Sequence, residues 1–236
     1  ALLAAEPAAT CDAAFDRLRE QLATFAGIDA VEPPPAFVGQ LRPYQKQGLG
    51  WMTFLERFNL GGCLADDMGL GKTVQVLAML EARRAAGAGA SLVVVPKSLI
   101  FNWRNEAAKF APQMRVLDQT GTARVKDATH LGQYDLVLTT YGTLRMDATY
   151  FKDATFDYVI LDEAQAIKNA STASAKAARL LKARHRLVLT GTPVENRLGD
   201  LWSLLDFLNP GMLGSANIFK ELISPKAAGG ESARAD

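Results

Sequence analysis

A glycine-containing stretch near residue 70 has the residue types of a loop that binds phosphate groups. It follows the short apolar run Cys63 to Ala65 and reads Asp66-Asp67-Met68-Gly69-Leu70-Gly71-Lys72-Thr73. A loop between a strand and a helix directs backbone N–H groups inward, and the positive N-terminal end of the helix attracts anions. Lys72 supplies a charge for the β- and γ-phosphates of a nucleotide, and the Thr73 hydroxyl can ligate Mg²⁺. We therefore predict that residues 67–73 bind a nucleotide.

The loop departs from the general phosphate-loop pattern at its first position. That pattern opens with glycine, and Asp66 stands there instead. The alternative interpretation is a glycine turn followed by a surface lysine. Gly69 and Gly71 do not form a dinucleotide fingerprint, because no third glycine follows at the required spacing.

Two adjacent carboxylates follow a second apolar run. Residues Phe156 to Leu161 predict a strand with a buried end, and Asp162-Glu163-Ala164-Gln165 comes next. Beside a phosphate loop, Asp162 can hold Mg²⁺ directly or through water, and Glu163 can orient and deprotonate the attacking water. The alternative is an acidic pair that caps a helix. Together with the loop, the pair predicts Lys72, Asp162 and Glu163 as catalytic residues and Thr73 and Asp162 as metal ligands.

Short apolar runs alternate with helical patterns from about Leu41 onward. The predicted strands are Gly62 to Ala65, Leu92 to Val95, Met114 to Leu117, Leu136 to Thr139, Tyr158 to Leu161 and Leu187 to Leu189. Helical patterns include Lys72 to Arg84 and Thr172 to Leu181. This alternation predicts an α/β fold, with a parallel sheet covered by helices on both faces. Ligands of such sheets bind beyond the carboxyl ends of the strands, where most of the residues named above are expected.

The two ends of the chain differ from this central part. Residues 12–26 predict a helix that Asp12 caps, with Phe15, Leu18, Leu22 and Phe25 on one face. The proline run Pro33 to Pro35 then ends any helix. We predict a helical extension and linker over 1–36, a nucleotide-binding domain over 37–214 and a flexible tail over 215–236.

Composition limits the class of protein. Hydrophobic residues make up 49% and charged residues 22% of the chain, as in soluble globular proteins. No apolar run approaches the roughly 20 residues that span a bilayer, so no membrane partner is expected. The net charge of +1 does not mark a nucleic-acid binder. Cys11 and Cys63 form neither a metal-binding spacing nor a disulfide framework, and we expect a cytoplasmic location.

Further segments, in a characteristic order, carry a family resemblance. They are Leu41-Arg42-Pro43-Tyr44-Gln45, the phosphate loop, Val93-Val94-Val95-Pro96, Thr139-Thr140-Tyr141-Gly142, the acid pair, and Leu189-Thr190-Gly191-Thr192-Pro193. The most specific stretch is GTPVENRLGDLWSLLDFLNPG, which ends at Gly211. Over roughly residues 41–214 the chain resembles the first RecA-like lobe of SWI/SNF-type ATPases within helicase superfamily two. The resemblance is to bacterial-looking members.

The resemblance implies an ATP-dependent translocase on double-stranded DNA that remodels protein–DNA complexes and uses ATP and Mg²⁺. It implies that Gln45 reads the adenine edge. Residues implied to face the DNA backbone are Pro96, Lys97, Ser98, Thr140 and Tyr141, with Asn196 near the DNA. Thr190 and Thr192 would link the nucleotide site to the DNA surface. For Lys97 and Asn196 the alternative is ordinary solvated surface.

One residue departs from the family pattern. The family commonly has His at the fourth position of the acid motif, where this chain has Gln165. Glutamine can bridge by hydrogen bonds but cannot become a cation. We interpret it as a tolerated variant that can alter coupling between the ATP and DNA sites. Trp51, Trp103 and Trp202 are expected to be packing residues, since a motor on duplex DNA contacts phosphates rather than bases.

The resemblance also implies a partner lobe. Superfamily-two motors bind ATP between two lobes, and the second lobe supplies arginine fingers. The 22 residues that follow Gly214 are too few for such a lobe, so we expect it to be missing from this chain. The competing hypothesis is a module that binds nucleotide or DNA without turnover. The intact Lys72, Thr73, Asp162 and Glu163 favour the enzyme, and the block before Gly211 disfavours an RNA helicase.

Overall fold

A computed structural model describes residues 27–122, 124–191, 198–214 and 219 of the chain. The predicted helix over residues 12–26 and the tail beyond Gly214, apart from residue 219, lie outside the described residues. Within the described part, one sheet of six parallel strands has the order β1-β6-β5-β2-β4-β3. No helix in this part is both long and apolar enough to cross a membrane.

The predicted parallel sheet is confirmed, with changes in strand bounds. The strands are β1 (Gly62–Leu64), β2 (Ser91–Val95), β3 (Val116–Asp118), β4 (Leu136–Thr140), β5 (Thr155–Asp162) and β6 (Lys182–Leu189). Strand β6 begins earlier than predicted, and β5 begins one residue before the predicted run Phe156 to Leu161. In β5 the buried Asp157 is paired with Arg83 at 2.7 Å. The first residues of β6 are mostly exposed or half-buried, so they need no apolar pattern.

The helices that cover one face of the sheet are α2 (Pro43–Arg57), α3 (Lys72–Ala85) and α4 (Ile100–Phe110). Pro43 occupies the first helical position of α2, where its missing N–H costs nothing. One core cluster joins apolar residues of these helices to the sheet, among them Met52, Leu77, Trp103 and Ile160. Burial of this cluster fixes the two helices whose N-terminal ends reach the phosphate loop.

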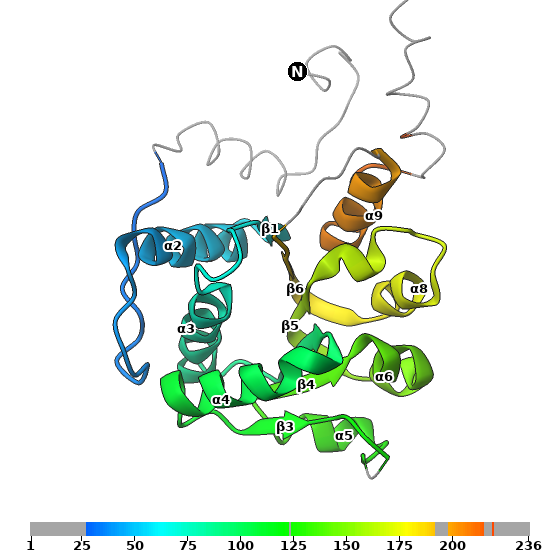
Figure 1. Ribbon diagram of the computed structural model, residues 1–236, viewed down its shortest axis with the longest axis horizontal. Helices are drawn as coiled ribbons and strands as arrows, with labels where there is room; N and C mark the ends of the chain where they lie inside the picture. Colours follow the sequence, from blue (N-terminus) through cyan, green and yellow to red (C-terminus); the bar gives the residue numbers. More distant parts are fainter. Residues whose placement is uncertain (1–26, 123, 192–197, 215–218, 220–236) are drawn as a thin grey trace, which may run out of the picture.

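The other face is covered by α6 (Tyr141–Met146), α7 (Ala148–Phe151), α8 (Ala173–Arg179) and α9 (Leu198–Leu208), with α5 (Ala128–Leu131) beyond β3. A second core cluster includes Leu144, Phe151, Phe156 and Phe207. Helices therefore cover both faces, as predicted (Figure 1). The helix predicted from Thr172 starts one residue later, because the Thr172 side chain caps it by accepting from the Ala175 N–H at 3.2 Å. Among the described residues there are also two short 3₁₀ helices, η2 (Lys97–Leu99) and η3 (Ala164–Ile167).

Candidate active site

The carboxyl ends of the strands bring the predicted site residues to one edge of the sheet. Leu64 of β1 pairs with Leu189 of β6, and Leu189 pairs in turn with Asp162 of β5. On the other side, the last residue of β2 pairs with Thr140 of β4. The phosphate loop, the acid pair and the two segments that follow β2 and β4 thus all leave the sheet at the same edge, although they are far apart in sequence.

The loop after β1 has the backbone geometry that glycine permits. Gly69 has φ 83° and Gly71 has φ 76°, and both values lie in the left-handed region that glycine adopts without strain. Gly71 precedes α3, so Lys72 and Thr73 open the helix. The ammonium of Lys72 donates to the carbonyl oxygens of Asp66 and Asp67, the latter at 3.1 Å. Lys72 is therefore folded over the loop whose N–H groups and helix end can hold phosphate.

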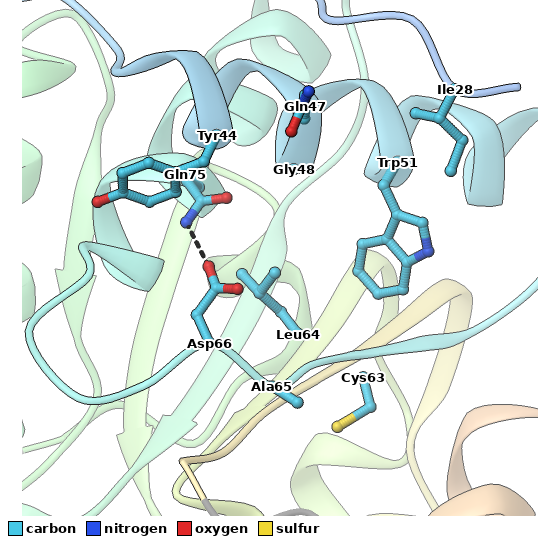
Figure 2. A pocket seen from close by; sticks show the side chains of 10 residues that line it. All are labelled: Ile28, Tyr44, Gln47, Gly48, Trp51, Cys63, Leu64, Ala65, Asp66 and Gln75. Carbon is cyan, nitrogen blue, oxygen red and sulfur yellow. Dashed lines mark hydrogen bonds between the residues drawn. The ribbon is translucent and has the colours of Figure 1, made fainter.

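A buried glutamine supports the start of the loop. Gln75 of α3 is 0% exposed, and its amide Nε2 donates to Asp66 Oδ2 at 2.9 Å (Figure 2). Its Oε1 has no hydrogen-bond partner among the described residues. It faces Gly48 of α2, where a Cβ atom would come within 2.0 Å of it. Asp66, which replaces the glycine of the general pattern, is thus used to anchor the loop to α3.

A cavity of about 590 Å³ lies beside this contact. It is bounded by α2, by the end of β1 and by Gln75, and its lining includes Tyr44, Trp51 and Cys63 (Figure 2). Burial raises the pKa of the Cys63 thiol to about 11, although nearby Lys72 lowers it. The cavity therefore has an apolar wall of aromatic and aliphatic side chains and a polar wall at Asp66 and Gln75.

The N-terminal end of α2 holds the far side of the loop. Gln45 accepts the Arg42 N–H at 2.9 Å and donates from Nε2 to the carbonyl of Leu70 at 3.0 Å. The Tyr44 hydroxyl donates to the same carbonyl at 3.0 Å. Gln45 is buried. The oxygen of its amide contacts the N-terminal end of α2, and the nitrogen contacts the phosphate loop. The predicted contact of Gln45 with adenine stays a prediction.

The carboxylate of Asp162 is held from two directions. Its Oδ2 accepts the indole N–H of Trp103 at 2.9 Å, and its Oδ1 accepts the Glu163 N–H at 2.9 Å. Burial raises the pKa of Asp162, whereas these two hydrogen bonds and the charge of Lys72 lower it and Glu163 raises it. Lys72 and Glu163 therefore each lie close enough to Asp162 to affect its pKa, and the catalytic role of the three residues stays a prediction.

The second acid adopts an uncommon backbone conformation. Glu163 has φ 50° and ψ 55°, in the left-handed region, which few residues other than glycine, Asn and Asp occupy. Its Oε2 accepts from the exposed Gln165 amide at 2.8 Å. Gln165 therefore contacts the acid pair, and its predicted part in coupling the ATP and DNA sites stays a prediction. Strained residues of this kind gather at functional sites.

The donor set fits a magnesium ion. Mg²⁺ takes oxygen ligands and binds through one or two carboxylates together with substrate phosphates. Each oxygen of Asp162 accepts one of the hydrogen bonds above and keeps acceptor capacity for a metal or its water. Thr73 lies in the first turn of α3, beside Lys72. We therefore keep Thr73 and Asp162 as the candidate ligands.

The residues after β6 contact the phosphate loop. The Thr190 N–H donates to the carbonyl of Leu64 at 3.3 Å, and Thr190 is buried. A Cβ atom on Gly191 would lie 3.3 Å from the Met68 side chain, which is 81% exposed. The segment that was predicted to link the two sites therefore begins against the loop. Thr192 and Asn196 lie outside the described residues.

The two segments predicted to face DNA border one groove. It has a volume of about 770 Å³ and is lined in part by Lys97, Arg104, Arg124 and Thr140. Lys97 and Ser98 are exposed and Pro96 is half-buried. The Tyr141 ring packs beside the second core cluster, and its hydroxyl donates to the carbonyl of Asp162 at 2.8 Å. Burial raises the pKa of Tyr141 well above its usual range, so this hydroxyl remains a donor.

Three residues of the site were not predicted from the sequence. Trp103 is a core residue, as expected, but it also donates to Asp162. Gln75 anchors the loop, and Glu106 lies one helical turn after Trp103. Burial raises the pKa of Glu106, and the charge of Asp162 contributes to the rise. No spacing rule connects α4 with β5. The sign available in the sequence was that residues 102, 103 and 106 (Asn, Trp and Glu) carry hydrogen-bonding groups within about one turn of a helix.

Comparison with known proteins agrees with this geometry. The family model of the SNF2-related domain matches residues 44–235. A putative ATP-dependent helicase/translocase of Bacillus subtilis, YwqA, is 45% identical over 190 residues, covering 78% of this chain and 21% of the relative. The TATA-binding protein-associated factor MOT1 of Saccharomyces cerevisiae is 37% identical over 216 residues, covering 85% of this chain and 12% of the relative.

A solved structure supports the same assignment. The Sulfolobus solfataricus SWI2/SNF2 ATPase core in complex with double-stranded DNA superposes with a TM-score of 0.76 at 44% identity, covering 82% of this chain and 40% of that one. The fold and site define a RecA-like nucleotide-binding lobe. The chain belongs to the SNF2-related family. It spans about a fifth or less of the length of these curated relatives.

Proposed function

We propose that this chain is the ATP-binding lobe of an ATP-dependent motor that moves along double-stranded DNA and remodels protein–DNA complexes. The observation that carries the proposal is the single sheet edge shared by the phosphate loop, the acid pair and the basic groove. These features leave strands β1, β5, β2 and β4 at the same edge of one sheet, so a change at the nucleotide can reach the groove along that edge. A second lobe, Mg²⁺ and a cytoplasmic location belong to the same proposal.

In this proposal the loop residues bind the phosphates and the acid pair carries out the chemistry. Lys72 would leave the carbonyls of Asp66 and Asp67 for the β- and γ-phosphates, where its charge offsets theirs. Mg²⁺ held by Thr73 and Asp162 would polarise the transferred phosphoryl group. Glu163 would accept the proton of the attacking water, and its hydrogen bond with Gln165 would orient it.

The groove supports contact with a phosphate backbone rather than with bases. Lys97 stands there among small hydroxyl side chains such as Thr120 and Thr140, and both kinds of side chain donate to phosphate oxygens. Arg104 and Arg124 also line the groove but are ion-paired with Asp118 and Asp147, so each would exchange a carboxylate for a phosphate on binding. A motor that moves along DNA must act on DNA of any base sequence. Contacts with the phosphate backbone do not depend on the base sequence and are therefore expected. The proposed target is therefore duplex DNA, with a DNA-bound protein complex as the object that is remodelled.

Replacement of Lys72 by alanine tests the nucleotide site. Lys72 is half-buried and makes its hydrogen bonds within the loop, so Lys72→Ala removes charge more than packing. We expect it to abolish tight binding of a non-hydrolysable ATP analogue in calorimetry, with circular dichroism unchanged. The control is Lys152→Ala, at an exposed lysine after α7, which should bind like the unaltered chain. Unchanged affinity in Lys72→Ala would refute the phosphate-loop assignment.

A further inference from the structure

Asp162 is hydrogen-bonded to both segments that border the basic groove. Its carboxylate Oδ2 accepts the indole N–H of Trp103 at 2.9 Å, and its carbonyl accepts the Tyr141 hydroxyl at 2.8 Å. Trp103 lies on α4, which continues directly from η2 and therefore from the exposed Lys97 and Ser98. Tyr141 opens α6 directly after Thr140. The candidate metal ligand is thus one hydrogen bond away from each segment.

We propose that Trp103 is a positioning residue that sets the Asp162 carboxylate for the metal and ties it to the groove, with Tyr141 as the second tie. The inference rests on the proposed function. Trp103 is 0% exposed and belongs to the core cluster that also contains Val95 and Leu138. Its ring therefore cannot turn away independently, and a shift of α4 moves the indole N–H.

The hydrogen-bond inventory explains why this donor matters. An indole N–H can donate but cannot accept, and an ionised carboxylate can accept but cannot donate. The contact therefore matches a donor to one oxygen of Asp162 and leaves the remaining lone pairs of the carboxylate free to accept from a metal's water or to bind the metal. With Oδ1 held by the Glu163 N–H and Oδ2 held by Trp103, the plane of the carboxylate is fixed. Partners of this kind orient the ligands of a metal and tune its affinity.

Trp103→Phe is the direct test, because it keeps an aromatic ring and removes the N–H. The measured quantity is the Mg²⁺ concentration at half-maximal binding of a fluorescent, non-hydrolysable ATP analogue to this chain. We expect it to rise roughly 10-fold, as is typical when an outer-shell partner is removed, while binding in EDTA stays unchanged. Tyr141→Phe should raise it less. The control is Trp202→Phe in α9, whose indole donates to the Gly214 carbonyl at 3.3 Å away from the acid pair.

A spectroscopic measurement on the unaltered chain keeps the test decisive if Trp103→Phe does not fold. The indole ¹H–¹⁵N resonance of Trp103 should move when Mg²⁺ and the analogue are added, whereas the resonance of Trp202 should stay. A tryptophan that only packs in the core, without a contact to the metal-binding carboxylate, would not respond. An unmoved Trp103 resonance at saturating Mg²⁺ and analogue would overturn the inference.

A double-mutant cycle tests the tie to the groove. Pro96→Gly loosens the segment that leads into η2 and α4, and it should raise the Mg²⁺ midpoint in the unaltered background but much less in Trp103→Phe. The effects of independent substitutions on the free energy are additive, so fold-changes in the midpoint that simply multiply would refute the tie. An unchanged midpoint in Trp103→Phe would refute the positioning role. The proposed function itself would fail differently, by unchanged nucleotide affinity in Lys72→Ala.

Discussion

Substitution of Gly48 by alanine should destabilise the chain, against the usual effect of such a change in a helix. Alanine is better than glycine in a helix interior by up to about 1 kcal/mol. At Gly48, however, the new Cβ would lie 2.0 Å from Oε1 of the buried Gln75. The amide must therefore retreat, and its 2.9 Å hydrogen bond with Asp66 is lost.

The expected size follows from these two opposing contributions. A hydrogen bond to a charged group contributes about 1.5–3 kcal/mol, and the gain in helix propensity offsets up to about 1 kcal/mol of its loss. We expect Gly48→Ala to lower the free energy of unfolding by about 0.5–2 kcal/mol. Chemical denaturation of the chain measures it. Gly199→Ala in α9 is the matched control, because a Cβ there meets nothing within 4 Å.

The sign of the effect should reverse when the obstacle is removed. In a Gln75→Ala background, Gly48→Ala no longer meets the amide and should stabilise the chain by up to about 1 kcal/mol. Calorimetry should show weaker binding of an ATP analogue in Gly48→Ala, because Asp66 no longer anchors the loop. If Gly48→Ala is as stable as the unaltered chain, the role given to Gln75 is wrong.

Two further predictions concern acidic residues. Glu163→Gln, in a protein with both lobes, should keep ATP binding and lose about 10²- to 10⁴-fold of turnover, because an amide cannot accept the proton of water; turnover within a few-fold of the original would assign the base elsewhere. The second concerns Asp147, whose pKa is lowered by hydrogen bonds from Arg124 and Lys126 against the opposing effect of burial. A lowered pKa means that this carboxylate stabilises the fold above its unfolded pKa of about 3.9 and that the stabilisation is lost as pH falls through the folded value. Asp147→Asn should therefore lower stability at pH 7 and flatten its loss below pH 4 in acid denaturation. Asp153→Asn, at an exposed position, should do neither.

The parts of the site that depend on local sequence could be predicted. Strand, loop and helix follow one another at residues 62–85, and the glycines and Lys72 mark the loop without reference to the rest of the chain. The acid pair likewise follows directly on an apolar strand. The parallel sheet followed from the alternation of elements, because each apolar strand must be covered on both faces.

The supporting contacts could not be predicted, because they join side chains from elements distant in sequence. Trp103 and Asp162 meet because α4 packs over the sheet that contains β5, and neither residue type indicates the other. The same holds for Gln75, whose amide could have been an ordinary helix surface group. The order of the strands in the sheet could not be predicted either, because the alternation of strands and helices does not indicate which strands are neighbours. The early residues of β6, from Lys182 onward, were missed because they are exposed or half-buried and carry no apolar pattern.

The pairing of β1 with β6 determines when the phosphate loop can be completed during folding. Gly62–Leu64 and Leu187–Leu189 are the first and last strands of the described sheet along the chain, yet they are hydrogen-bonded neighbours at its edge. Contacts so distant in sequence form late, because the chain entropy of closing the long loop must be overcome first. Synthesis proceeds from the N-terminus, so Lys72 leaves the ribosome well before the strand that fixes its loop. A nucleotide stabilises a fold only by binding the native form. A nucleotide therefore cannot stabilise this lobe until β6 has been synthesised. Until then β1 lacks its partner strand, and no bound nucleotide protects it from pairing with other chains.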